Sequence, residues 1–150
     1  MNVALLVIGI VLAVLVVQLL WIVPVVLHFR RENERLDREL AASMAAETII
    51  RPMERGSYRG STVPGAPKVK NTGRIGLTAR RLVFRTATSR LVEIPVSTMT
   101  GVRESKGFNG AVHGGTTHLV VTTSDGEYGF IVADPAEWTA LLDGVVQRSR

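Results

Sequence analysis

The side chains able to perform acid–base or metal chemistry are few in this sequence, and their spacing does not suit either task. The chain has no cysteine, which removes thiol nucleophiles, disulfides and cysteine zinc sites together. Its three histidines, His28, His113 and His118, are the only side chains with an ordinary pKa near neutrality. No His-Glu-x-x-His motif occurs, and no acidic residue lies between His113 and His118. The sequence therefore predicts no enzyme activity, no catalytic residue, no metal and no cofactor.

The glycine-rich segment GFNGAVHGG, residues 107–115, is a candidate for a phosphate-binding loop. A phosphate-binding loop needs the order G-x-x-x-x-G-K-[ST] and a helix after it, so that backbone N–H groups converge on the anion. This segment lacks that order, and a run of β-branched residues follows it. We interpret it as a mobile loop between two strands.

Positive charge is the feature that indicates a ligand. The net charge is +5, and residues 51–90 contain ten basic side chains against a single acid, Glu54. An anionic cytoplasmic leaflet attracts each basic residue close to its surface by about 1 kcal/mol. The candidate contacts to an anionic ligand or surface are Arg59, Lys68, Lys70, Arg80 and Arg81.

The nature of that ligand stays open between anionic lipid headgroups and a protein with an acidic segment, and the basic half could also be a solvated face. Nucleic acid is not expected, because the basic half lacks interleaved aromatic residues and a recognition helix. A helical stalk over residues 30–47 would be roughly 25 Å long, which holds the basic half beyond the screening length unless the helix folds back.

Residues Val3–Leu27 form an apolar run in which Gln18 is the only strongly polar side chain. At about 1.5 Å per residue this run is long enough for a hydrocarbon core about 30 Å thick. A cleaved signal peptide would have a positively charged start and a shorter apolar core. The sequence therefore predicts a transmembrane anchor over residues 1–29. Arg30 and Arg31 follow the span while no basic side chain precedes it, so we expect a cell-membrane protein with its N-terminus outside and its C-terminal domain in the cytoplasm.

Residues 30–47 are rich in good helix formers and contain neither Gly nor Pro. Leu36, Leu40 and Met44 recur at helical spacing and form one narrow apolar stripe. This pattern is typical of a solvated helical stalk, or of a short coiled-coil seam that would make a homo-oligomer. The stripe covers barely two heptads, so both interpretations stay open.

Residues 48–150 change to an alternating pattern that predicts about six or seven antiparallel strands. Residues 56–73 are rich in Gly, Pro and Ser, which indicates a loop with a short strand near 57–62. Asp125-Gly126 between two β-rich runs is a strong hairpin signal. Asp134, Pro135 and an apolar stripe then predict a capped C-terminal helix over residues 135–147, whose Trp138 face packs on the sheet.

The order of these segments resembles the pleckstrin-homology-like (PH-like) superfold in its GRAM-like and bacterial PH-like versions. The residues that carry the resemblance, over about residues 47–148, are GRIGLT, RLVF, EIPV leading to Gly101-Val102, HLVVTT with EYGFIV, and DPAEWTALL, with Ile75 in place of a usual Leu. The chain also resembles small actinobacterial membrane proteins with one N-terminal span and a cytoplasmic PH-like domain.

The resemblance implies a partly open antiparallel β-barrel or sandwich capped by the C-terminal helix, attached here to one transmembrane helix. It implies no activity, because PH-like folds bind headgroups, peptides or proteins and some only scaffold. In headgroup-binding PH domains the basic residues around the first hairpins make the contacts, which favours Arg80 and Arg81. We expect a membrane-tethered, non-enzymatic interaction module that binds a protein partner or anionic lipid. The alternative is an accessory or structural subunit of a membrane complex, such as a transporter or a cell-envelope assembly.

Overall fold

The computed structural model describes residues 3–88, 90–112 and 114–149. The chain divides into two compact units, Met1–Ala42 and Ser43–Arg150. A single helix, α1 (Val3–Ala45), makes up the described part of the first unit, and its last turn belongs to the second. Among the described residues, no helical stretch combines the length and the apolarity that crossing a membrane requires. The helix is confirmed, and the predicted membrane crossing by Val3–Leu27 stays a prediction.

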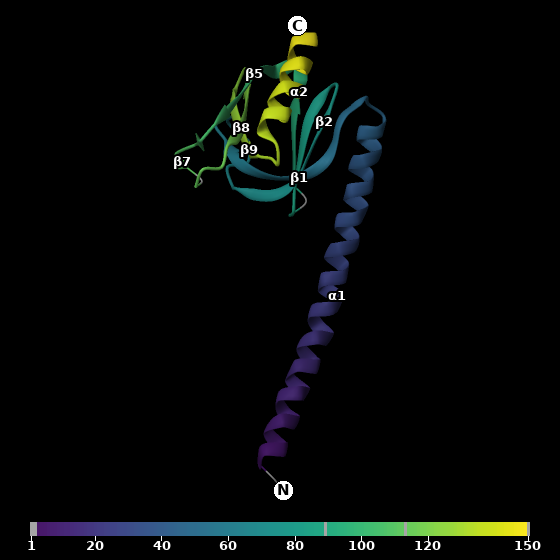
Figure 1. Ribbon diagram of the computed structural model, residues 1–150. Helices are drawn as coiled ribbons and strands as arrows, with labels where there is room; N and C mark the ends of the chain where they lie inside the picture. Colours follow the sequence, from purple (N-terminus) through teal and green to yellow (C-terminus); the bar gives the residue numbers. More distant parts are fainter. Residues whose placement is uncertain (1–2, 89, 113, 150) are drawn as a thin grey trace. The chain divides into compact units, whose positions relative to one another are not determined.

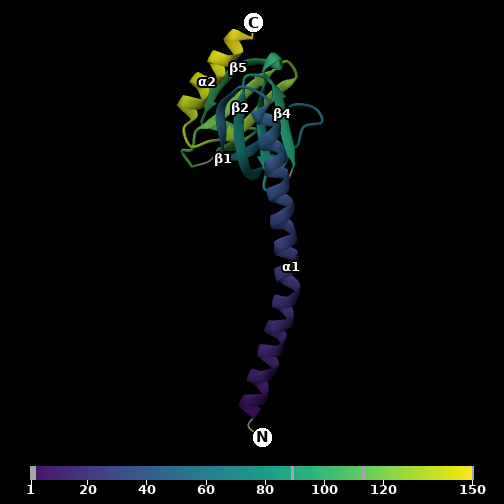
Figure 2. The ribbon, with the colours of Figure 1, turned by 90° about the vertical axis from the view of Figure 1, so that its right-hand side faces the viewer.

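The second unit is a mainly-β domain built on one antiparallel sheet of seven strands in the order β4-β3-β2-β1-β9-β8-β5. The two edge strands, β4 and β5, are not hydrogen-bonded to each other, so the sheet does not close completely. Figures 1 and 2 show how strongly the sheet curves and how helix α2 lies against it. The elements are β1 (Ile49–Ser61), β2 (Asn71–Thr78), β3 (Arg81–Thr86), β4 (Leu91–Pro95), the short 3-10 helix η1 (Val96–Thr98), β5 (Met99–Ser105), β8 (His118–Thr123), β9 (Gly126–Ile131) and α2 (Pro135–Arg148). The predicted antiparallel β domain with a C-terminal helix is confirmed.

Strand β1 is longer than the short strand that the sequence predicted near residues 57–62, because it begins at Ile49 and ends at Ser61. Pro52 has no backbone N–H to donate, and Pro is normally confined to strand edges or bulges. Here it lies at a register shift between Arg51 and Glu54, where β1 pairs with β2 alone. From Ser57 onward β1 pairs with β2 on one side and β9 on the other. The proline is tolerated because the strand is still at an edge when it passes through.

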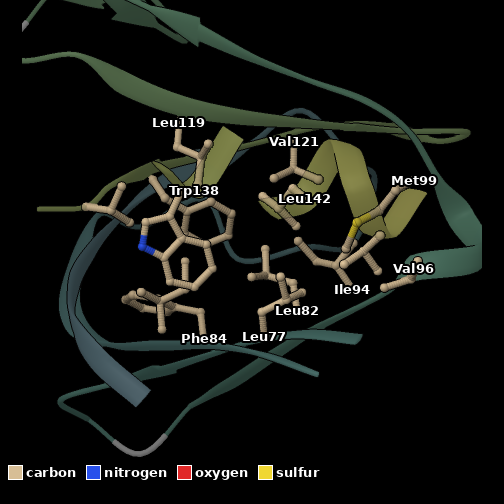
Figure 3. Close-up of a cluster of buried hydrophobic side chains, with 14 of the residues drawn as sticks. Leu77, Leu82, Phe84, Ile94, Val96, Met99, Leu119, Val121, Trp138 and Leu142 are labelled. Atoms are coloured by element: carbon tan, nitrogen blue, oxygen red, sulfur yellow. The ribbon is translucent and has the colours of Figure 1, made fainter. Parts of the chain in front are cut away.

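The core lies between the concave face of the sheet and α2 (Figure 3). Tyr58, Phe84 and Phe130 form an aromatic triangle at its centre, with ring centroids 5.6–5.8 Å apart. Tilted aromatic pairs at this separation stabilise a core beyond the area they bury. Four apolar residues that alternate with other positions along the β2–β3 hairpin are all fully buried: Ile75, Leu77, Leu82 and Phe84.

Helix α2 begins as predicted, because Asp134 caps it by accepting a hydrogen bond from the backbone N–H of Glu137 at 3.0 Å. Trp138 is fully buried, and its indole Nε1–H donates to Glu54 Oε1 at 2.8 Å. Arg51 donates to the other oxygen of Glu54 at 2.8 Å and pairs with Glu137 at 2.6 Å. The hydrogen bond with Glu137 raises the pKa of Arg51 above its ordinary value. Strand β1 therefore holds the helix through one carboxylate and one guanidinium.

The segment interpreted as a mobile glycine-rich loop contains a short hairpin, β6 (Gly107–Phe108) and β7 (Ala111–Val112). Its turn residues Asn109 and Gly110 have φ values of 51° and 74°. A two-residue turn with both φ values positive matches the twist of paired strands. Phe108 is buried, because its ring occupies the space that a side chain at Gly129 of β9 would fill. The interpretation as loop was wrong here, since one anchored aromatic ring orders the hairpin.

Met44 packs inside the β domain, although its spacing placed it on the stalk stripe. It is 2 % exposed, and a Cβ at Gly76 of β2 would lie 2.9 Å from its methyl group. The sulfur of Met53 lies against the same glycine. The compact domain thus begins at Ser43, whereas the sequence placed its start at residue 48. Leu36 lies outside the residues whose side chains are described, so the coiled-coil seam stays a prediction.

Replacing Glu54 by alanine should destabilise the domain by about 1–3 kcal/mol, because the buried Trp138 N–H loses its acceptor and Arg51 loses one of its two carboxylate partners. Chemical denaturation followed by circular dichroism measures the change. Glu104→Ala is the matched control, since Glu104 is exposed on β5 and its removal should change stability by less than about 0.5 kcal/mol. Equal losses in the two variants would contradict the role given to Glu54.

Candidate functional site

The structure places four of the five predicted contact residues in two groups at opposite ends of β2. Lys68 and Lys70 lie in the β1–β2 loop, directly before β2 begins, whereas Arg80 and Arg81 lie at the β2–β3 turn that follows it. Because β2 is eight residues long, about 25 Å of strand separates the two groups. They cannot form one compact site.

Arg81 is held by carboxylates of the domain itself. Its guanidinium pairs with Glu47 at 3.1 Å and also with Glu93 on β4. Glu47 in turn accepts a hydrogen bond from the hydroxyl of Thr78 at 2.5 Å, and that hydroxyl accepts the backbone N–H of Arg81 at 3.1 Å. These contacts fasten the turn to the chain that precedes β1. The charge of Arg81 is therefore opposed by two acids before any ligand arrives.

Arg80 and Arg59 differ in their access to solvent. Arg80 is exposed in the turn. Arg59 is only 9 % exposed and lies at a bulge of β1, between Tyr58, which pairs with Phe130, and Gly60, which pairs with Gly129. Gly60 has a φ of 108°, a conformation that favours glycine. The bulge thus turns Arg59 into the domain, at the base of the β1–β2 loop.

The β1–β2 loop, residues 62–70, is fixed at both ends and in its middle. The hydroxyl of Tyr58 donates to the carbonyl of Pro67 at 2.6 Å. The Oγ1 of Thr62 accepts the backbone N–H of Glu127 at 2.8 Å. Asn71 donates to Thr88 at 3.1 Å, which connects the loop to the β3–β4 turn. The loop therefore presents its tip in a defined position.

The tip of this loop combines charge with exposed apolar surface. Val69 is 69 % exposed and stands between Lys68 and Lys70, which are both exposed. Leu91, at the start of β4 across the Asn71–Thr88 contact, is 47 % exposed and follows the exposed Arg90. We call this surface the loop end; it comprises Lys68, Val69, Lys70, Arg90 and Leu91.

The sequence pattern indicates the lysines of the loop end but not its apolar members. Val69 falls in the predicted loop and Leu91 at the start of a predicted strand, and the exposure of neither side chain follows from its spacing. In the described part of the β domain, the exposed large apolar side chains are Ile49, Val69 and Leu91. The sequence signal for this exposed apolar surface is a valine between two lysines in a Pro/Gly-rich loop, where neighbouring apolar side chains are few.

Few side chains suited to acid–base or metal chemistry are present among the described residues. His118 is fully buried in β8. No group of three or more His, Cys, Asp or Glu side chains is arranged for a metal in the described part of the chain. His113 and the side chain of His28 lie outside the described residues. The expectation that the chain is not an enzyme stays a prediction.

Comparison with known proteins adds fold information. No family model matches the sequence, and no curated protein matches it. The C-terminal domain of an unknown protein from Leishmania infantum matches with a TM-score of 0.51 at 14% identity, over 76% of this chain and 97% of that chain. The observed architecture, a curved antiparallel sheet with a C-terminal helix, is consistent with the PH-like fold that the sequence resembles.

Two further solved structures share this likeness at lower scores. The complex of human RhoA with the DH/PH fragment of PDZRHOGEF matches with a TM-score of 0.46 at 11% identity, over 69% of this chain and 30% of that chain. The linker-DH/PH domains of p115-RhoGEF match with a TM-score of 0.45 at 12% identity, over 68% of this chain and 30% of that chain. This chain thus spans about a third of either matched chain, and the two matches carry no inference about its function.

Stability should fall at alkaline pH in a way that depends on Tyr58. Burial raises the pKa of the Tyr58 hydroxyl to about 12, against an ordinary value of 10.0. The folded state then retains a proton that the unfolded chain releases, so unfolding becomes easier as the pH rises from about 10 to about 12. Tyr58→Phe should flatten this dependence, and at neutral pH it should cost about 1 kcal/mol because the bond to Pro67 is lost.

Urea denaturation at a series of pH values measures both effects. Burial also raises the pKa of Tyr128, so Tyr128→Phe is the control that keeps the Tyr58 contribution. Parallel loss of stability in wild type and Tyr58→Phe above pH 10 would contradict the assignment.

Proposed function

We propose that this chain is a membrane-tethered, non-enzymatic PH-like interaction module whose loop end docks on anionic lipid headgroups at the cytoplasmic face of the cell membrane. The observation that carries the proposal is the exposure of Val69, 69 %, between two exposed lysines on a loop held by the Tyr58–Pro67 hydrogen bond. Lysines that flank an exposed apolar side chain suit an anionic membrane interface, where the charges meet headgroups and the apolar side chain leaves water.

The combination of charge and apolar surface favours lipid over other ligands of the loop end. Each lysine near an anionic leaflet contributes about 1 kcal/mol. Transfer of a valine or leucine side chain out of water contributes roughly 1.5–3 kcal/mol when burial is complete. Lys68, Lys70 and Arg90 would therefore meet the headgroups while Val69 and Leu91 enter the interface. A solvated basic face would carry the charges without these apolar side chains.

The tether is inferred from α1. Its described large apolar side chains between Val7 and Leu27 are 46–74% exposed. A helix surface of this kind is costly in water, and contiguous apolar patches of this size mark interaction with lipid or with other proteins. The run Val3–Leu27 has the length of a bilayer core, and Arg30 and Arg31 favour a cytoplasmic domain.

The kind of PH-like domain is also inferred. The order of GRIGLT, RLVF, EIPV and DPAEWTALL supports a GRAM-like or bacterial PH-like version, in a small single-pass membrane protein of actinobacterial type. The inference rests on these sequence motifs and on the β2–β3 hairpin, β4 and α2 that they form.

A second candidate function is that of an accessory or structural subunit of a membrane complex. The exposed apolar side chains of α1 favour it as much as they favour a lipid-embedded tether, because other transmembrane helices would cover them equally well. Affinity capture of the full-length protein from mild detergent tests this function. A partner recovered at constant stoichiometry supports it, and a protein recovered alone or only with copies of itself contradicts it.

Removal of the loop-end charges should abolish lipid docking. We expect residues 43–150, the compact unit that contains the whole β-domain core, to float with vesicles of phosphatidylcholine and phosphatidylserine and not with phosphatidylcholine alone. Lys68→Gln/Lys70→Gln should reduce the floated fraction at least fivefold, since about 2 kcal/mol of attraction is removed. Val69→Asp should reduce it similarly.

The matched control is Lys106→Gln/Arg148→Gln, which removes the same charge from exposed positions away from the loop end. It should float like the wild type. Flotation that is absent with anionic vesicles at low salt, or that responds equally to both double variants, would rule out docking through the loop end.

A further inference from the structure

Three arginines stand in register across neighbouring strands on the convex face of the sheet. Arg55 of β1 lies opposite Arg74 of β2, and Arg74 lies opposite Arg85 of β3. Residues directly opposite each other share one face of a sheet, with Cα atoms about 4.5–5.5 Å apart. The neighbouring positions Ile75 and Phe84 are buried in the core, so alternation places the arginines on the other face. We call Arg55, Arg74 and Arg85 the arginine row.

The arginine row is unfavourable for folding. Like charges directly opposite each other on a sheet destabilise it. Elsewhere in the domain, arginines that serve the fold have acid partners: Arg51 pairs with Glu54 and Glu137, Arg81 with Glu47 and Glu93, and Arg103 with Glu127. No carboxylate of the described residues forms an ion pair with Arg55 or Arg74, and both side chains are exposed. Folding alone therefore does not account for them.

On one side the row is bordered by small side chains. The next register pair on the same face is Ser57 opposite Thr72, two small hydroxyl residues. Arg74 is steadied by a hydrogen bond from its guanidinium to the carbonyl of Met53 at 3.4 Å. Arg85 is 6 % exposed, so it adds positive charge at the end of the row while Arg55 and Arg74 offer the contacts.

From these observations we infer that the arginine row binds an acidic helical segment of a partner protein. Arginine presents a planar fork that binds carboxylates in a bidentate manner, whereas the loop end uses lysines, which act as point charges. Carboxylates at i and i+4 on a helix lie about 5–6 Å apart, close to the spacing of the arginines. A helix laid across the strands beside Ser57 and Thr72 would place carboxylates against the exposed Arg55 and Arg74, while the buried Arg85 contributes only its positive charge.

The inference goes beyond lipid docking and does not depend on it. A lipid surface is the alternative occupant, because the register continues from Arg85 to Leu91 at the loop end. Around Arg55 and Arg74 themselves, however, no large exposed apolar side chain is present in the described residues. This part of the surface offers a bilayer positive charge but no apolar side chain that could insert into it. A row of carboxylates, in contrast, would be complementary to the arginines.

A labelled peptide tests the row on the full-length protein in neutral detergent, where no anionic lipid competes. The probe is a helical alanine-rich peptide with glutamates at i, i+4 and i+8, compared by fluorescence anisotropy with a peptide of equal composition whose glutamates are spread around the helix. The one-face peptide should bind more tightly. Arg55→Gln/Arg74→Gln should weaken that binding at least about tenfold, while Lys106→Gln/Arg148→Gln should not.

The same variants separate a binding role from a structural one. Since Arg55→Gln/Arg74→Gln relieves repulsion between opposite arginines, its melting temperature should equal or exceed that of wild type. A clear drop would mean that the row serves the fold and would overturn the inference. It would also be overturned by equal binding of the two peptides, or by unchanged peptide binding together with lost flotation on phosphatidylserine vesicles. Loss of flotation in the Lys68/Lys70 variant alone leaves the row unaffected.

Discussion

The position of β1 as the one strand shared by both halves of the sheet is the constraint on which the domain depends. Its second half pairs with β2 on one side and β9 on the other, while its first half pairs with β2 alone. The unpaired side of the first half is where α2 is attached, through Glu54 and Arg51 to Trp138 and Glu137. The change of pairing partner thus opens the space that the helix fills, and the core forms between them.

The same strand arrangement distributes the charges. Because β1, β2 and β3 are consecutive antiparallel neighbours, basic residues that are far apart in the sequence are brought either into register, as in the arginine row, or to opposite ends of a strand, as with Lys70 and Arg80. Arg81 is neutralised by Glu47 and Glu93, so it stabilises the first turn. What the sequence presents as one basic half is three surfaces with different chemistry.

These surfaces are compatible with a module that binds more than one partner at once. The loop end pairs lysines with exposed Val69 and Leu91, which suits a lipid interface. The arginine row has no such apolar residue beside Arg55 and Arg74, which suits an acidic protein segment. A membrane tether would raise the local concentration of both ligands around the domain, so that weak contacts at each surface become effective together.

The sequence by itself determined the elements whose pattern is local. The Asp134 cap with Pro135 and the alternation that buries Ile75, Leu77, Leu82 and Phe84 follow from spacing and propensity, and both are present. The hairpin expected at Asp125-Gly126 is also present, but its two turn residues are Ser124 and Asp125, and Gly126 pairs with Thr123. The tertiary structure alone decided the length of β1 through Pro52, the packing of Phe108 on Gly129, and the burial of Met44 against Gly76. It also decided which arginines form ion pairs with acidic residues and which lie opposite other arginines in the sheet register. These outcomes depend on register and on contacts between segments distant along the chain, and no local pattern encodes them.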